Sequence, residues 1–274
     1  MHKIIKFNLV FLFLTLNFSH IIAVPLTRGV GSTAIEALMN KWIHNYFLQQ
    51  HKQIEYQAVG SGVGLKFLHD QKFDFAISDM PCDNDILRKR HWTQFPIAIS
   101  QLDIIYNLPG ITEPLVLNAE VTADIFMNRI KKWNDPKIHA LNPNLKLPNK
   151  KIIIVYRANE SGTTYTLSHF LSQASAEWAQ FYGSSLVIDK KTALGTSTDQ
   201  TLAKTVKTLP YSIGYTNDVY AVSERVSRVE FINETGNLVL PEKLYAYAAL
   251  ANHRVYSNSE ELLNNLMNLH SFPD

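Results

Sequence analysis

The chain has 274 residues, of which 46% are hydrophobic and 18% are charged. This composition is typical of a globular protein, with one large domain or two smaller lobes. The formal net charge is only +2 and there is no polybasic block, so no binding to nucleic acid or to an anionic membrane surface is indicated. The single cysteine, Cys82, leaves no internal disulfide, so a packed core must stabilise the protein.

Residues 1–23 have the layout of a secretory signal peptide. Lys3 and Lys6 give a short positive start, residues 7–18 are almost wholly apolar, and the small residue Ala23 closes the segment. The apolar run is short for a membrane span. The alternative is a buried first helix. The sequence predicts removal of residues 1–23 and a mature protein in the periplasm or outside the cell.

Strand-like and helix-like segments alternate along the rest of the chain. Strands are predicted at 54–59, 73–77, 97–107, 152–156 and 212–215, and helices from residue 32 and at 63–69, 122–132, 163–171 and 201–209. This repetition of strand, turn and helix predicts an α/β protein with open sheets. Ligands of such sheets bind beyond the carboxyl ends of the strands.

Three turns rich in Gly, Ser and Thr lie between a strand and a helix, at Gly29–Thr33, Gly60–Gly62 and Ser161–Thr163. The start of a helix has unpaired N–H groups and a partial positive charge, and glycine lets an anion approach the backbone. Each turn is therefore suited to an oxyanion. Ser and Thr are also common helix caps, so any one turn could serve for capping alone. Three such turns together favour binding.

Two charged residues at strand ends indicate which oxyanion is bound. Arg157 can hold an oxyanion through two parallel hydrogen bonds, although a surface ion pair is the alternative. Asp79 would repel an anion unless the ligand has a proton to donate. Phosphate keeps such a proton near neutral pH, whereas sulfate does not. Asp79 would therefore accept a hydrogen bond from phosphate and disfavour sulfate or molybdate as ligands.

Several motifs, in order along the chain, resemble the PstS-type phosphate-binding proteins, which are substrate receptors of the phosphate ABC importer. The similar segments are GVGST (29–33), YQAVGSGVG (56–64), FDFAISD (73–79), IKKWND (130–135) with LNP (141–143), RANESGT (157–163) and LPYSIGY (209–215). The family counterparts include G-A-G-A-T-F, D-F-G-A-S-D, I-x-x-W-N-D and R-x-D-G-S-G-T.

The resemblance implies a type II periplasmic-binding-protein fold with two lobes, each an open sheet flanked by helices. We place the first lobe at 24–107 and the second at 108–274. It also implies a monomer that binds inorganic phosphate between the lobes, without a metal or other cofactor, and passes it to a membrane-embedded ABC permease. The implied phosphate contacts are Thr33, Ala34, Ser61 and Asp79 from the first lobe, and Arg157, Ser161, Gly162 and Thr163 from the second.

Three features depart from the family pattern. Ala34 replaces a phenylalanine, but the family uses the backbone N–H at this position. Asn159 and Glu160 replace Asp-Gly, and that aspartate normally helps to hold the arginine. The chain stops at Asp274, where family members continue back into the first lobe. We therefore expect a shortened, incomplete first lobe whose sheet has an uncovered edge.

Two further readings compete with phosphate capture. A secreted phosphatase of the same fold would need a metal cluster or an activated nucleophile. No nucleophile elbow is present, and the histidines do not pair at metal spacing; they include His44, His51, His69, His91, His139, His169 and His253. We therefore predict no catalytic residues. A non-functional remnant of a phosphate-binding protein is the other alternative.

Overall fold

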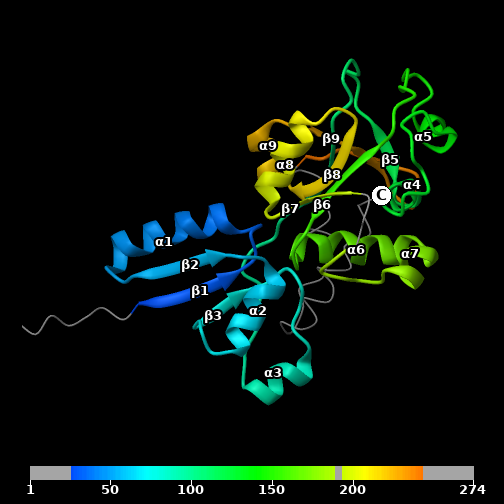
Figure 1. Cartoon of the computed structure of the whole chain (residues 1–274). Helices are drawn as coiled ribbons and strands as arrows, with labels where there is room; N and C mark the ends of the chain where they lie inside the picture. The colour runs from blue at the N-terminus through cyan, green and yellow to red at the C-terminus, as the bar shows by residue number, and fades with distance from the viewer. Residues whose placement is uncertain (1–25, 189–192, 243–274) are drawn as a thin grey trace, which may run out of the picture.

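The computed structural model describes residues 26–188 and 193–242 (Figure 1). The predicted signal peptide at 1–23 and the chain end at 274 lie outside the described residues. Within them the strands form three sheets, in the orders β2-β1-β3, β7-β6-β8-β4-β9 and β11-β10-β5. Helices flank these sheets, so the predicted α/β class is confirmed.

The sheet β2-β1-β3 and its helices form the first lobe. Its elements are β1 (Thr27–Gly31), α1 (Glu36–Gln50), β2 (Ile54–Ala58), α2 (Ser61–His69), β3 (Phe75–Ile77) and α3 (Asn84–Arg90). The strands are parallel and β1 lies between the other two. Because the chain crosses from β1 to β2 and then back past β1 to β3, right-handed connections put α1 and α2 on opposite faces of the sheet. Such a reversal of strand order is where α/β sheets bind ligands.

The five-stranded sheet is the centre of the second lobe. Its elements are β4 (Leu102–Tyr106), α4 (Ala119–Phe126), α5 (Pro136–Leu141), β6 (Ile153–Arg157), α6 (Gly162–Ala174), α7 (Ala176–Phe181), β7 (Leu194–Thr196), α8 (Asp199–Thr208), β8 (Ser212–Asn217), α9 (Asp218–Glu224) and β9 (Ser227–Arg228). A small sheet of β5 (Val116–Asn118), β10 (Glu230–Ile232) and β11 (Leu238–Val239) accompanies it. Since β6, β7 and β8 are parallel, their carboxyl ends share one edge, where α6, α8 and α9 begin.

Several predicted boundaries are wrong. The strand predicted at 97–107 is only β4, and the helix predicted at 122–132 is α4, which begins after Asn118 because this side chain accepts a hydrogen bond from the N–H of Val121. Helix α1 begins later than residue 32 because Ser32 and Thr33 use their side chains elsewhere.

The strand β4 pairs antiparallel with β8. It therefore belongs to the sheet of the second lobe, although the predicted division at residue 107 places these residues in the first lobe. Only a tertiary pairing decides this membership. The division of the chain as a whole stays a prediction.

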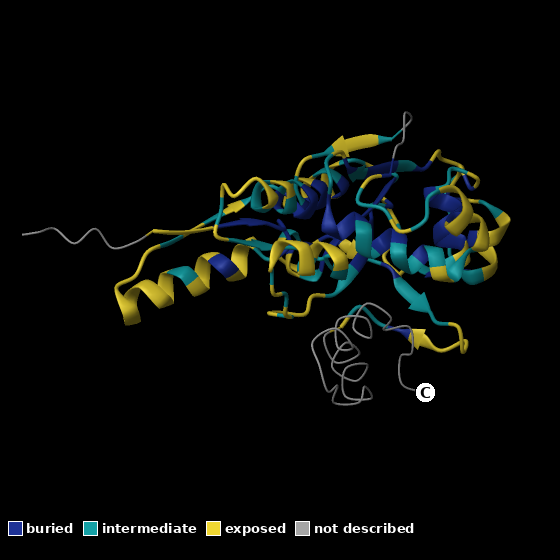
Figure 2. Cartoon of the chain, turned by 90° about the horizontal axis from the view of Figure 1, so that it is seen from below, coloured by how far each residue is buried: buried dark blue, intermediate teal, exposed yellow. Residues whose placement is uncertain are grey.

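The main hydrophobic core lies in the second lobe. A continuous buried cluster runs from Ile104 to Val229 and includes the fully buried Trp133 and Trp178. In the described part of the first lobe, the buried apolar side chains are Val30, Ala34 and Met39. Helix α1 exposes much of its apolar surface, as the yellow helix in Figure 2 shows; its exposed apolar residues are Leu38, Trp42, Tyr46, Phe47 and Leu48.

This difference in burial predicts a difference in local stability. Apolar burial contributes about 25 cal/mol per Å², so strands of the first lobe should open at a lower free energy than those of the second. Amide hydrogen exchange on the ligand-free protein should be faster in β1 and β2 than in β6 and β8. Slower exchange in β1 and β2 would contradict this account.

Candidate functional site

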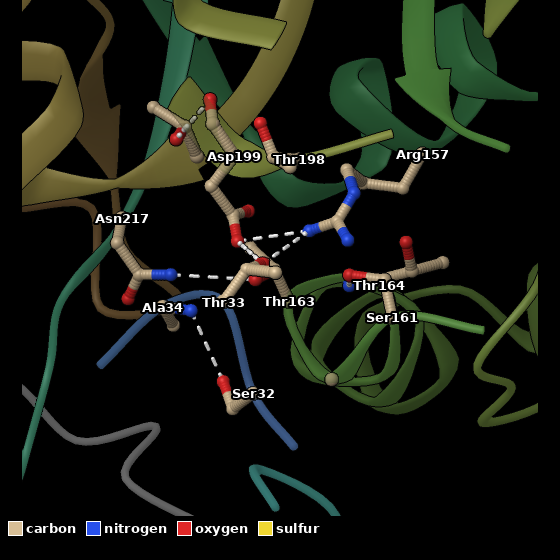
Figure 3. A network of polar contacts seen from close by, with 12 residues as sticks. Ser32, Thr33, Ala34, Arg157, Ser161, Thr163, Thr164, Thr198, Asp199 and Asn217 are labelled. Carbon is tan, nitrogen blue, oxygen red and sulfur yellow. Dashed lines mark hydrogen bonds and ion pairs between the residues drawn. The ribbon is translucent and has the colours of Figure 1, made fainter. Parts of the chain in front are cut away.

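The two lobes meet where the carboxyl ends of their strands face one another. After β1, the hydroxyl of Thr33 donates a 2.6 Å hydrogen bond to Oδ2 of Asp199, at the start of α8. Arg157, at the end of β6, donates from Nη1 to the same Asp199 oxygen at 2.8 Å and to Oγ1 of Thr33 at 3.1 Å. Figure 3 shows this triangle of side chains. It joins the lobes directly.

The backbone of the Thr33 loop is held from both lobes. Tyr220 of α9 donates its hydroxyl to the carbonyl of Thr33 at 2.9 Å, and Tyr56 of β2 donates to the carbonyl of Ser32 at 2.8 Å. The N–H of Ala34 donates to Oγ of Ser32 at 3.1 Å. In this structure the N–H of Ala34 is therefore used within the loop, and its implied contact with phosphate stays a prediction.

Arg157 is fully buried, and its guanidinium group is held on several sides. Besides Asp199 and Thr33, it donates from Nη2 to the carbonyl of Ser197 at 2.9 Å and to Oδ1 of Asn159 at 3.1 Å. Asn159 thus keeps one hydrogen bond to the arginine, while the negative charge comes from Asp199. The alternative reading of Arg157 as a surface ion pair is wrong, because neither partner is exposed.

Two buried atoms in this group have no hydrogen-bond partner within the described residues. They are Nε of Arg157, which is a donor, and Oδ1 of Asp199, which is an acceptor. Leaving a buried polar group unpaired costs about 1–3 kcal/mol, and more when the group is charged. Nearly all buried polar atoms in proteins are paired, and exceptions gather at functional sites. A ligand with both acceptor and donor oxygens would suit this pair.

Asp79 follows β3 and belongs to the first-lobe side of the contact between the lobes. Its Oδ2 accepts hydrogen bonds from the hydroxyls of Ser32 at 2.7 Å and Ser61 at 3.1 Å. Burial raises the pKa of the Asp79 carboxyl, the bond from Ser32 opposes this shift, and the charge of Asp199 adds to it. A carboxylate in this setting favours a partner that can donate a proton.

Gly162 brings the second lobe against Asp79. A Cβ atom at this position would clash with Oδ2 of Asp79 and with Oγ of Ser61. Only glycine therefore lets the first turn of α6 approach the first lobe so closely. The N–H groups and positive end of α6 consequently lie beside Asp79 and its partners Ser32 and Ser61, the Asp79 cluster.

The other predicted residues of α6 have structural partners of their own. Ser161 caps the helix, because its hydroxyl accepts a 3.3 Å hydrogen bond from the N–H of Thr164. Oγ1 of Thr163 accepts from Nδ2 of Asn217 at 3.3 Å, and Figure 3 shows Asn217 beside it. Capping does occur at Ser161, although this turn also lies at the contact between the lobes.

The structure thus brings the eight predicted site residues to one region between the lobes: Thr33, Ala34, Ser61, Asp79, Arg157, Ser161, Gly162 and Thr163. That they contact phosphate stays a prediction. Sequence reasoning missed Asp199, Asn217 and Tyr220. A signal for Asp199 does exist, since Thr198 and Asp199 open a helix with a capping box directly after a strand.

Asn159 and Glu160, which stand where the family has Asp-Gly, make further contacts between the lobes. Glu160 forms a 2.6 Å ion pair with Lys66 of α2, and its carbonyl accepts from the N–H of Gly62 at 3.4 Å. Nδ2 of Asn159 donates to the carbonyl of Val59 at 3.4 Å. The side chains of both residues thus form bonds across the contact between the lobes.

Within the described residues, no group of three or more His, Cys, Asp or Glu side chains could hold a metal ion. In the same part of the chain, no helix has the length and apolar character needed to cross a membrane.

The fold and the site match a known class of protein. Residues 23–268 match the PBP superfamily domain. Two solved structures have a similar fold at 18% identity: an ABC-type phosphate transport receptor from Vibrio cholerae, with a TM-score of 0.53 over 89% of this chain and 93% of that one, and a high affinity periplasmic phosphate-binding protein (PfluDING) bound with phosphate, with a TM-score of 0.65 over 86% and 70%. The chain is a member of the PBP superfamily.

Similar relatives narrow the family. Phosphate-binding protein PstS of Haemophilus influenzae is 34% identical over 82% of this chain and 67% of its own length. The proteins of the same name from Pasteurella multocida and Xylella fastidiosa (strain Temecula1) are each 36% identical, over 82% and 85% of this chain and 65% and 64% of their own lengths. The chain spans about two thirds of the length of these relatives. It belongs to the PstS-type phosphate-binding protein family.

Proposed function

We propose that this protein binds inorganic phosphate between its two lobes and delivers it, in the periplasm, to an ABC-type import permease. The observation that carries the proposal is the buried guanidinium group of Arg157, which donates to the hydroxyl of Thr33 in the first lobe and whose Nε has no partner within the described residues. The names of the PstS relatives support phosphate as the ligand.

The geometry gives phosphate two kinds of partner. Arg157 offers a charged donor: its Nη atoms already have protein partners, and its Nε, which has none within the described residues, can donate to a phosphate oxygen. The first turn of α6, with Gly162 and Thr163, offers backbone N–H groups and the positive end of the helix dipole. The hydroxyls of Thr33 and Ser61, which donate to Asp199 and Asp79 in this structure, would turn to phosphate when it binds. Binding therefore needs both lobes, and we expect the protein to act as a monomer.

The proposal includes no catalytic step and no cofactor. Hydrolysis of a phosphate ester would need a metal-activated water or an activated nucleophile. Delivery requires only that the lobes can separate again. Within residues 26–188 and 193–242, the polar contacts between them are hydrogen bonds and one exposed ion pair, Lys66 with Glu160. Such exposed pairs contribute about 0–1 kcal/mol. This is compatible with release to a permease.

Selectivity for phosphate over sulfate should depend on Asp79. Its carboxylate accepts a hydrogen bond from the O–H of phosphate, whereas sulfate would leave a half-buried carboxylate facing an oxyanion, at a cost of about 1–3 kcal/mol. The wild-type protein should bind phosphate at least about tenfold more tightly than sulfate, and Asp79→Asn should narrow this gap because the amide can donate a hydrogen bond. Calorimetric titration with both anions measures it.

The matched control is Asp74→Asn, since Asp74 is an exposed residue of the same segment. It should keep the wild-type selectivity. Equal binding of the two anions by the wild-type protein would remove the role assigned to Asp79.

Affinity should depend on Arg157. Loss of a buried, charge-assisted contact costs about 2–5 kcal/mol, so Arg157→Ala should weaken phosphate binding at least about tenfold. Arg157→Lys keeps the charge but loses the fork, and should also weaken binding. Competition with radiolabelled phosphate gives both affinities, and circular dichroism verifies that each variant is folded.

Arg129→Ala is the control for a general loss of positive charge. Arg129 is partly exposed and pairs with Asp124 and Glu177, away from the site. Its removal should change affinity little. Similar losses in the Arg129 and Arg157 variants would show that Arg157 has no special role.

A further inference from the structure

Asp199 is a buried carboxylate that neither the motifs nor the family resemblance includes. It is the first residue of α8 and is fully buried, with a relative exposure of 0%. Its Oδ2 is bonded to Arg157 and to Thr33, two of the predicted phosphate contacts, while its Oδ1 has no partner within the described residues. One oxygen of the Asp199 carboxylate thus binds Arg157 and Thr33, while the other is left to accept a hydrogen bond.

The charges around this group are unequal. Arg157 brings one positive charge, whereas Asp79 and Asp199 bring two negative ones; Arg157 and Asp199 are fully buried, and Asp79 is half-buried. A doubly charged anion would add two further negative charges to a buried region that already has a net negative charge. Burying like charges together is unfavourable unless protons are shared between them.

We propose that Asp199 is a specificity-determining residue, and that together with Asp79 it selects the singly charged dihydrogen form of phosphate. This inference rests on the proposed function. Dihydrogen phosphate has two O–H donors, so it can give one to each carboxylate while its remaining oxygens accept from Arg157 and the hydroxyls. Hydrogen phosphate has only one O–H, which leaves one carboxylate against an oxyanion. Sulfate has none.

Other ionisable groups around the site do not supply this selection. Tyr56 interacts with Asp79, and Tyr215 and Tyr220 interact with Asp199. Burial raises the pKa of Tyr215 and of Tyr220 to about 12 in each case, and it raises the pKa of Tyr56 further. All three tyrosines stay neutral below pH 9. Glu36 also interacts with Tyr56 and Tyr220, but it is exposed. Asp79 and Asp199 are therefore the carboxylates that we expect to meet the protons of the ligand.

The test is the pH dependence of phosphate affinity. Above the second pKa of phosphate, which lies near neutrality, the singly charged fraction falls about tenfold for each pH unit. The wild-type dissociation constant for total phosphate should therefore rise about tenfold per unit between about pH 7.5 and 9. In Asp199→Asn the amide can donate to an anionic oxygen, the doubly charged form becomes acceptable, and the rise should fall below about threefold per unit.

A matched control and a second measurement complete the design. Asp218, like Asp199, is the first residue of a helix, and Asp218→Asn should keep the wild-type slope. Calorimetry at about pH 8.5 in two buffers of different ionisation enthalpy counts the protons bound with phosphate. We expect close to one proton per phosphate for the wild-type protein and close to none for Asp199→Asn.

The outcomes separate this inference from the proposed function. If the Asp199→Asn variant binds more weakly by the same factor at every pH, Asp199 only holds Arg157 in place, and the inference is wrong. Phosphate binding by the wild-type protein without proton uptake also overturns it, even if the variant does not fold. If the wild-type protein binds no phosphate at any pH, the proposed function itself fails.

Discussion

A guanidinium group that is cut off from water must find its partners inside the protein, because a buried unpaired charge costs several kcal/mol. Arg157 meets this requirement with Asp199, Thr33, Asn159 and the carbonyl of Ser197. These partners come from both lobes. Parallel pairing of β6 with β7 and β8 brings the arginine, the start of α8 and Asn217 to one edge, and Thr33 reaches that edge from the first lobe.

Close approach of the lobes depends on small residues as well as on charge. Gly162 lets α6 touch the Asp79 cluster, and Gly31, with a φ of +135°, would clash with the carbonyl of Ile77 if it had a Cβ atom. Both glycines were part of turns that the sequence singled out for anion binding. Their role in the structure is broader, because they also set the distance between the backbones that carry the site.

Local patterns in the sequence were enough to predict the strand–turn–helix units and the three glycine turns, and they placed Arg157 and Asp79 at the ends of strands. They could not predict Asp199, because its pairing with Arg157 requires β6 and β7 to be neighbours although the two residues are 42 positions apart. For the same reason the sequence could not show which sheet β4 joins. Its apolar residues predict a buried strand, but only its contact with β8 decides which sheet it joins.

Diffraction from crystals of the protein grown with phosphate tests the central claim most directly. The account predicts one phosphate ion between the lobes, held by the guanidinium group of Arg157, the first turn of α6 and the hydroxyl of Thr33, with Asp79 and Asp199 each within hydrogen-bond distance of a phosphate oxygen. A phosphate ion bound to only one lobe, or elsewhere, while Arg157 keeps only its protein partners, would contradict it.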